Sequence, residues 1–170
     1  MSYRWIGAIL VLSSCAGFGF YAAAAYRREI RILRQIIGMA DLMESELNYR
    51  LTPLPELCRR TGKLSGGVIR KVLYGLAEEL DRQICPDVAS CMRCALSETD
   101  NLPRSAQRIL SGLGGYLGQY DLPGQLKGLD TVRTSCSRAL EKLEQNRESR
   151  LRSYQTLGLC AGAALVILFI

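Results

Sequence analysis

The sequence contains no histidine, and only 7% of its 170 residues are aromatic. Without an imidazole, Ser-His-Asp and Cys-His catalysis, histidine-ligated metal sites and imidazole proton relays are excluded. Sustained alternation of polar and apolar residues is also missing, so we expect no β-sheet. A chain of this length forms at most one ordinary domain with short extensions.

Two short patterns resemble chemical motifs but lack the rest of the site. Residues 64–67, Leu-Ser-Gly-Gly, match part of the ATP-binding-cassette signature, but the chain has no GxxxxGK[ST] phosphate loop. Glu78, Glu79 and Asp81 would lie on different sides of one helix, which favours a solvated surface over a magnesium site. The basic residues are dispersed without interleaved aromatics, which argues against nucleic-acid binding. We therefore predict no catalytic, cofactor-binding or metal site.

The hydrophobic residues are concentrated at the two ends of the chain. Residues 5–25 carry no charge, and a helix of this length spans the ~30 Å hydrocarbon core of a bilayer. Residues 153–170 would form a second helix of about 27 Å, with Tyr154 at headgroup depth. We predict transmembrane helices over 5–25 and 153–170, a short external tail at 1–4 and a middle segment at 26–152. A buried core helix or an interfacial tail is the alternative for 153–170.

Basic residues flank both apolar segments on the side of the middle segment. Of the 22 lysines and arginines, all except Arg4 lie within residues 26–152, as do all 16 acidic residues. Because positively charged flanks stay in the cytoplasm, we predict a cytoplasmic middle segment with both termini outside. Flanking arginines also bind anionic lipid headgroups. The predicted flanking residues are Arg27, Arg28, Arg31, Arg34, Arg147, Arg150 and Arg152.

A cleaved or lipidated signal sequence is the alternative for the first apolar segment. Residues 22–25, four alanines, resemble a signal-peptidase site, and residues 12–15, Leu-Ser-Ser-Cys, fit a lipoprotein signal. Against both, the apolar stretch continues for ten residues past Cys15, and the arginine cluster follows directly. The alternative function would then be a secreted or lipid-anchored helical binding module.

The seven cysteines form no recognisable disulfide or zinc pattern. Two lie in the apolar ends, which leaves an odd number, five, in the middle segment. Cys91 and Cys94 form the one CxxC, without the second pair that a structural zinc site usually needs and without a preceding strand typical of redox motifs. We interpret them as small apolar residues on one face of a helix. A small thiol enzyme is the remaining hypothesis for them.

Helical periodicity dominates the middle segment. Apolar residues recur every three or four positions from Ile30 to Leu47, which predicts a helix over 26–48 continuous with the first apolar segment. Prolines and glycines divide the rest. The further predicted helices begin at 55, cover 68–80, 87–98 and 103–118, and run from 122 toward 170. The predicted fold class is all-α, an antiparallel bundle of about six helices between an N-terminal and a C-terminal transmembrane helix.

Three elements occur in order along the chain. The first comprises residues 44–49 and 52–56, the second has the pattern LG-x-x-D-x-x-x-Q over 117–125, and the third is the glycine-containing segment 157–162. Together they resemble the stage III sporulation protein AB family of endospore-forming bacteria, over nearly the whole chain. The structural or partner-contact candidates are Glu44, Glu46, Tyr49, Pro53, Leu54, Pro55, Leu117, Gly118, Asp121 and Gln125.

The resemblance implies a non-enzymatic membrane platform, because the family is similar to the cytoplasmic domain of the type II secretion and type IV pilus inner-membrane platform protein. The implied role is assembly of the channel complex between mother cell and forespore. The implied partners are the cytoplasmic hexameric secretion ATPase, stage III sporulation protein AA, other membrane proteins of the complex and membrane lipid. The implied location is the mother-cell-derived outer forespore membrane, with the bundle facing the cytoplasm. No cofactor is implied.

Some of these candidates also have a local physical role. Gly118 can end a helix, Asp121 can cap the next helix, and Gln125 can hydrogen-bond back toward the loop. Glu44 and Glu46 can meet basic groups either within the bundle or on a partner. For all of them, an architectural role is the favoured interpretation.

Overall fold

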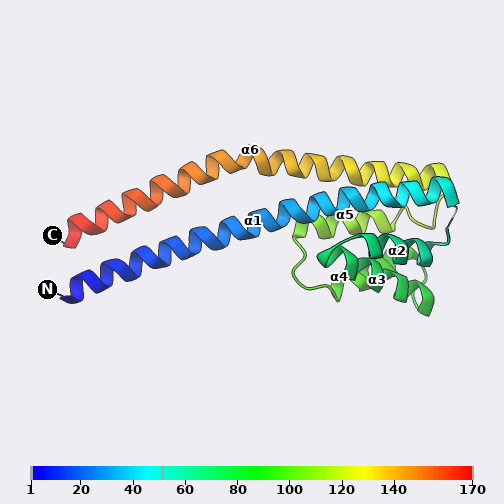
Figure 1. Ribbon diagram of the computed structural model, residues 1–170, viewed down its shortest axis with the longest axis horizontal. Helices are drawn as coiled ribbons and strands as arrows, with labels where there is room; N and C mark the ends of the chain where they lie inside the picture. The colour runs from blue at the N-terminus through cyan, green and yellow to red at the C-terminus, as the bar shows by residue number, and fades with distance from the viewer. Residues whose placement is uncertain (1, 51, 170) are drawn as a thin grey trace. The chain divides into compact units, whose positions relative to one another are not determined.

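The computed structural model describes the backbone of residues 2–50 and 52–169, and the side chains of residues 24–50 and 52–145 (Figure 1). Within this backbone there are six helices and no strand, so the predicted all-α class is confirmed. The helices are α1 (Ser2–Arg50), α2 (Leu54–Leu64), α3 (Gly67–Arg82), α4 (Val88–Ser97), α5 (Arg104–Gly114) and α6 (Leu122–Phe169).

The chain divides into two compact units. Unit 1 comprises Met1–Arg28 and Glu141–Ile170, and unit 2 comprises Glu29–Leu140. Among the described residues, none of the helices combines the length and the apolar character that a membrane span requires. The predicted transmembrane helices lie outside the described side chains, apart from Ala24 and Ala25, and so do Arg147, Arg150 and Arg152. The predicted segment boundaries therefore stay predictions.

Proline and a capping aspartate set the helix boundaries in unit 2. α1 ends shortly before Pro53, because a residue that precedes proline avoids the helical region. Pro55 lies in the first turn of α2, where its missing N–H costs no hydrogen bond. The Ser90 N–H donates to Asp87 Oδ1 at 3.0 Å, which caps α4. The five predicted helix starts after α1 are each confirmed to within one residue.

The predicted end of the helix over 103–118 is wrong. α5 ends at Gly114, and the last turn tightens as the Gly115 and Tyr116 N–H groups donate to carbonyls three residues back, at 3.1 and 2.9 Å. Gly118 then adopts a left-handed conformation with φ of 73°. The apolar pattern typical of a helix continues past Gly114, but the backbone there forms successive turns.

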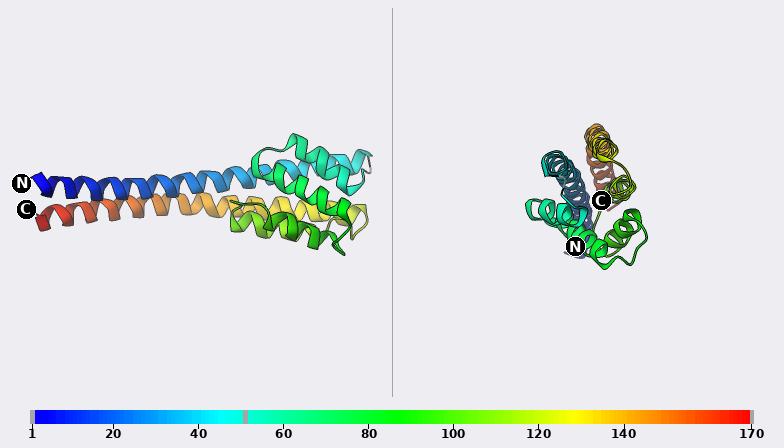
Figure 2. Two further views of the ribbon diagram at one scale, coloured as in Figure 1. Left: turned by 90° about the horizontal axis from the view of Figure 1, so that it is seen from below. Right: turned by 90° about the vertical axis from the view of Figure 1, so that its right-hand side faces the viewer.

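The core of unit 2 forms along α1 and between the short helices. Figure 1 and Figure 2 show α1 and α6 antiparallel, with α2 to α5 packed along them. Each short helix contacts the next one in the chain, α2 with α3, α3 with α4 and α4 with α5. The largest fully buried side chains include Leu33, Ile36, Met39, Met43, Leu57, Ile69, Leu73, Leu76, Met92, Leu110, Leu113 and Leu117.

One end of unit 2 carries three connections. The α1–α2, α3–α4 and α5–α6 connections all lie where α1 ends and α6 begins (Figure 1). The α2–α3 and α4–α5 connections lie at the opposite end, where the Ser105 hydroxyl donates to Glu29 Oε1 of α1 at 2.5 Å. We call the end of unit 2 that carries three connections the motif end, because the first two of the three sequence elements lie there.

Candidate functional site

The two sequence elements of unit 2 meet at the motif end, although about 70 residues separate them in the chain. They enclose a hollow of about 350 Å³. Four of the nine lining residues are leucine, and the lining includes polar side chains at positions 52, 121 and 125. The hollow is lined by Leu47, Thr52, Leu54, Leu57, Gly118, Tyr120, Asp121, Leu122 and Gln125.

Gly118 allows the α5–α6 connection to approach the other two. A Cβ atom at this position would lie 2.8 Å from Val88 Cγ2 at the start of α4 and 3.4 Å from Leu54 Cδ2 at the start of α2. The first distance is shorter than real Cβ contacts, and the positive φ is itself unfavourable for any residue with a side chain. Glycine is therefore required here both by the backbone conformation and by the packing.

Asp121 and Gln125 fix the start of α6. Asp121 Oδ1 accepts a hydrogen bond from the Gly124 N–H at 3.2 Å, and the Gln125 side-chain amide donates to the Tyr120 carbonyl at 3.0 Å. These are the cap and the return hydrogen bond that the sequence predicts. Leu117 is fully buried beneath them. The second element is thus an anchored helix start over a buried leucine.

Glu44 and Glu46 are paired within the bundle. Arg133 of α6 donates to Glu44 at 2.8 Å and also pairs with Asp41, so it joins α6 to α1. These hydrogen bonds raise the pKa of Arg133. Glu46 accepts from the Thr52 hydroxyl at 3.4 Å and lies 3.6 Å from Arg60 of α2. Of the two possibilities left open by the sequence, the structure shows the one within the bundle.

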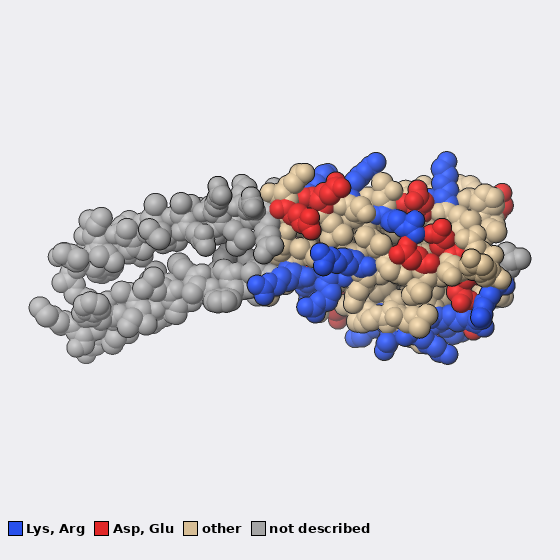
Figure 3. Space-filling view, turned by 45° about the horizontal axis from the view of Figure 1, so that its top comes forward, with Lys and Arg blue, Asp and Glu red and all other residues tan. Residues whose placement is uncertain are grey.

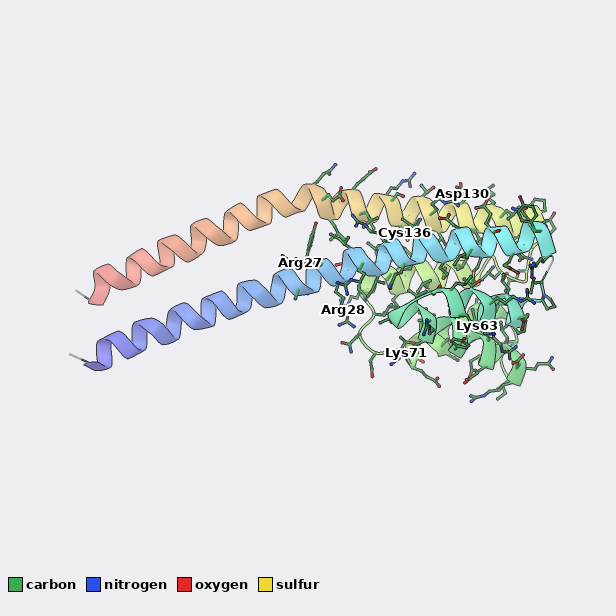
Figure 4. The ribbon with its side chains drawn as sticks, viewed as in Figure 1. Arg27, Arg28, Lys63, Lys71, Asp130 and Cys136 are labelled. Carbon is green, nitrogen blue, oxygen red and sulfur yellow. The ribbon has the colours of Figure 1, made fainter. Side chains whose placement is uncertain are left out.

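Ion pairs of this kind leave charges of both signs interspersed over the surface. Figure 3 shows acidic and basic side chains intermixed on the face in view. Asp130 lies on the exposed side of α6 and Cys136 on its buried side (Figure 4). Arg27, Arg28, Arg31 and Arg34 are all exposed along α1.

Aromatic and apolar side chains remain exposed at the motif end. Tyr49, two residues beyond Leu47 on α1, is 86% exposed, and Tyr120 is 55% exposed. Pro53 is exposed, whereas Leu54 and Pro55 are half-buried. The hollow with its exposed tyrosines has the composition of a protein contact, an apolar pocket with a few polar groups.

Sequence reasoning missed five residues that line the hollow, Leu47, Thr52, Leu57, Tyr120 and Leu122. Tyr120 and Leu122 flank Asp121, so adjacency to the second element was the signal available for them. Arg133 carried no such signal, because its partners Asp41 and Glu44 lie about 90 residues away.

The cysteines separate into core thiols and a corner cluster. Burial raises the pKa of Cys58 to about 12 and that of Cys136 to about 11. Cys91 is buried, as predicted for a packing residue. Cys94 is only half-buried, and its sulfur lies 3.9 Å from that of Cys85. The interpretation of Cys94 as a simple packing residue is therefore incomplete.

Comparison with known proteins places these features in context. The family model described as Stage III sporulation protein AB matches residues 4–170. A curated protein of Bacillus subtilis (strain 168), Stage III sporulation protein AB, is 23% identical over 168 residues, which covers 97% of this chain and 98% of that protein. A solved structure of a Stage III sporulation protein AB matches with a TM-score of 0.62 and 21% identity, and covers 72% of this chain and 98% of that one. At this identity the structural match shows a shared fold.

Proposed function

The chain belongs to the stage III sporulation protein AB family, and from this membership we propose that it is a non-enzymatic membrane platform on which a sporulation channel complex assembles. The complex would link mother cell and forespore, with this chain in the outer forespore membrane. Residues 5–25 and 153–170 would anchor it, and unit 2 would face the mother-cell cytoplasm.

The observation that carries the platform role is the hollow at the motif end. It joins two sequence elements by which the chain resembles its family, and the exposed Tyr120 is part of its lining. Tyrosine is enriched among residues that dominate binding energy at protein contacts. The charged residues of the same elements are already paired within the bundle, so apolar and aromatic contact is what this surface offers.

We propose that the motif end binds the cytoplasmic hexameric secretion ATPase, stage III sporulation protein AA. The test measures binding of that ATPase to the full chain in detergent, by interferometry, with wild type and two variants. Tyr120→Ala should weaken binding about tenfold or more, since truncated tyrosine anchors typically cost at least about 1.4 kcal/mol. Leu64→Ala is the matched control, because Leu64 is 72% exposed and lies at the opposite end of α2 from the hollow.

Equal affinity of the Tyr120→Ala and Leu64→Ala proteins would overturn the placement of the contact. Absence of wild-type binding would overturn the choice of ATPase as partner. Both variants replace exposed side chains, so their thermal midpoints should match that of wild type.

Topology separates the platform from the alternative, a secreted or lipid-anchored binding module. Cys85 and Cys94 are the two half-buried thiols among the five described cysteines, so they are the ones that a maleimide can reach. In intact cells a membrane-impermeant maleimide should leave both unlabelled, and detergent together with a metal chelator should make them reactive. Labelling before detergent treatment would support the secreted module instead.

A further inference from the structure

A cluster of three metal-ligating groups lies at the α3–α4 corner. The carboxylate of Glu79 and the sulfurs of Cys85 and Cys94 all lie within 4.8 Å of one another. Glu79 belongs to the last turns of α3, Cys85 to the connection, and Cys94 to α4. The sequence showed a two-cysteine motif at 91 and 94, and the fold adds two ligands from a separate segment.

The corner is held in shape by backbone features on both sides. Gln83 adopts a left-handed conformation with φ of 52° and ends α3, and the Asp87 cap begins α4. α3 and α4 pack closely, since a Cβ at Gly75 would lie 3.5 Å from the Cβ of Ala95. The three ligand groups therefore converge from elements whose separation is fixed by packing rather than from one flexible loop.

The electrostatics of the corner favour a cation. Glu79 is only 8% exposed, and it accepts a hydrogen bond from Arg82 at 3.0 Å. Arg82 compensates part of the charge of the buried carboxylate, and a divalent cation would stabilise the carboxylate and both thiolates together.

We propose that Glu79, Cys85 and Cys94 form a binding site for Zn²⁺. Two thiolates at about 2.3 Å from a tetrahedral zinc ion are separated by about 3.8 Å. The observed sulfur separation is 3.9 Å. Thiols in simple contact have a similar spacing, so the buried carboxylate next to them is what distinguishes this corner from ordinary packing.

Water or Cys91 would supply the fourth ligand of the Zn²⁺ ion. Cys91 is buried and lies one turn before Cys94 on α4. Cys91 is therefore adjacent to the cluster without belonging to the three groups that converge most closely. With three protein ligands and one exchangeable position, the site would tie the α3–α4 corner together.

The experiment uses the full chain in detergent, kept reduced with a phosphine and freed of metal by a chelator. Zn²⁺ is titrated in competition with a chromophoric chelator, and Co²⁺ is titrated separately to record sulfur-to-cobalt charge-transfer absorption. We expect one Zn²⁺ per chain, a tetrahedral thiolate spectrum with Co²⁺, and a higher thermal midpoint when Zn²⁺ is present.

Variants assign the ligands. Cys85→Ala, Cys94→Ala and Glu79→Gln should each weaken Zn²⁺ binding at least about tenfold, since even changes behind the ligands cost roughly 10- to 100-fold. The matched control is Cys58→Ala, which removes a buried thiol of α2 outside the cluster and should bind as wild type does. Circular dichroism of each metal-free protein reports whether it is folded.

Two results would overturn the site. One is wild-type protein that takes up no Zn²⁺ in competition with the chelator while its helical spectrum is intact. The other is folded Cys85→Ala and Cys94→Ala protein whose affinity equals that of Cys58→Ala. Neither result bears on the motif-end contact with the ATPase, which the Tyr120→Ala measurement tests independently.

Discussion

Different kinds of interaction hold the two sequence elements at the motif end in place. The α5–α6 connection depends on shape, with Leu117 fully buried and Gly118 in close approach to Val88. The α1–α2 turn depends on proline and on partly exposed hydrogen bonds and ion pairs around Glu46. A tightly packed segment tolerates little change, whereas an exposed, charged turn tolerates much. The α1–α2 turn is therefore free to vary with a partner, whereas the α5–α6 connection is constrained by the fold.

The largest expected effect sharpens this comparison. Leu117→Ala removes a fully buried side chain and should lower the free energy of unfolding by about 2–5 kcal/mol. Thermal and urea denaturation of the full chain in detergent measure it. Leu64→Ala, at a 72% exposed leucine, is the control and should change stability by less than about 0.5 kcal/mol. Equal losses in the two variants would show that the connection is not packed as described.

Gly118→Ala should have the next largest effect. An L-residue in the left-handed conformation costs about 1–2 kcal/mol, and the contact with Val88 adds to this cost. Gly112→Ala is the control, because Gly112 lies within α5 with nothing within 4 Å of the added Cβ. That substitution should stabilise the protein by about 0.5–1 kcal/mol. The opposite signs of the two changes are the result to look for in thermal melts.

Asp121→Ala should cost about 0.5–2 kcal/mol through loss of the α6 cap. Asp121→Asn keeps an acceptor at the same place and should retain most of the stability. A melt of Asp121→Ala that coincides with wild type would mean that the capping hydrogen bond contributes nothing to α6.

The charged turn should show the smallest effect, and acidification should remove it. A hydrogen bond from Arg60 lowers the pKa of Glu56 in the folded protein. A depressed folded pKa gives stability that is present above the unfolded pKa and is lost as the pH falls through the folded value. Both groups are solvent-exposed, so the contribution is small. The difference in melting temperature between wild type and Glu56→Gln should therefore shrink on acidification, and a difference that grows would contradict the pairing.

Much of the fold was predictable because local signals decide it. Pro53 and Asp121 mark helix boundaries through interactions within four residues, and the structure confirms both. The end of α5 was not predictable, because the apolar pattern continues past Gly114, whereas Gly118 has a positive φ and lies close to Val88, 30 residues earlier in the chain.

The candidate site was predictable only in part. The sequence named residues of both elements, but their meeting in one hollow depends on the antiparallel packing of α1 and α6. The pairing of Arg133 with Glu44 and the approach of Glu79 to Cys94 join residues at spacings that follow no helical or sheet period. Long-range pairs of this kind are set by tertiary structure alone.

The opposite end of unit 2 offers a place for a reporter. Asn101, in the α4–α5 connection, is exposed and adopts φ of 67°, and α5 carries the chain from there to the motif end over about 16 Å. A fluorophore attached at this position would leave the hollow and its tyrosines uncovered. Because the only tryptophan is Trp5, such a dye would also dominate the optical signal of the helical unit. Energy transfer from it to a labelled protein could then measure association without altering the surface under study.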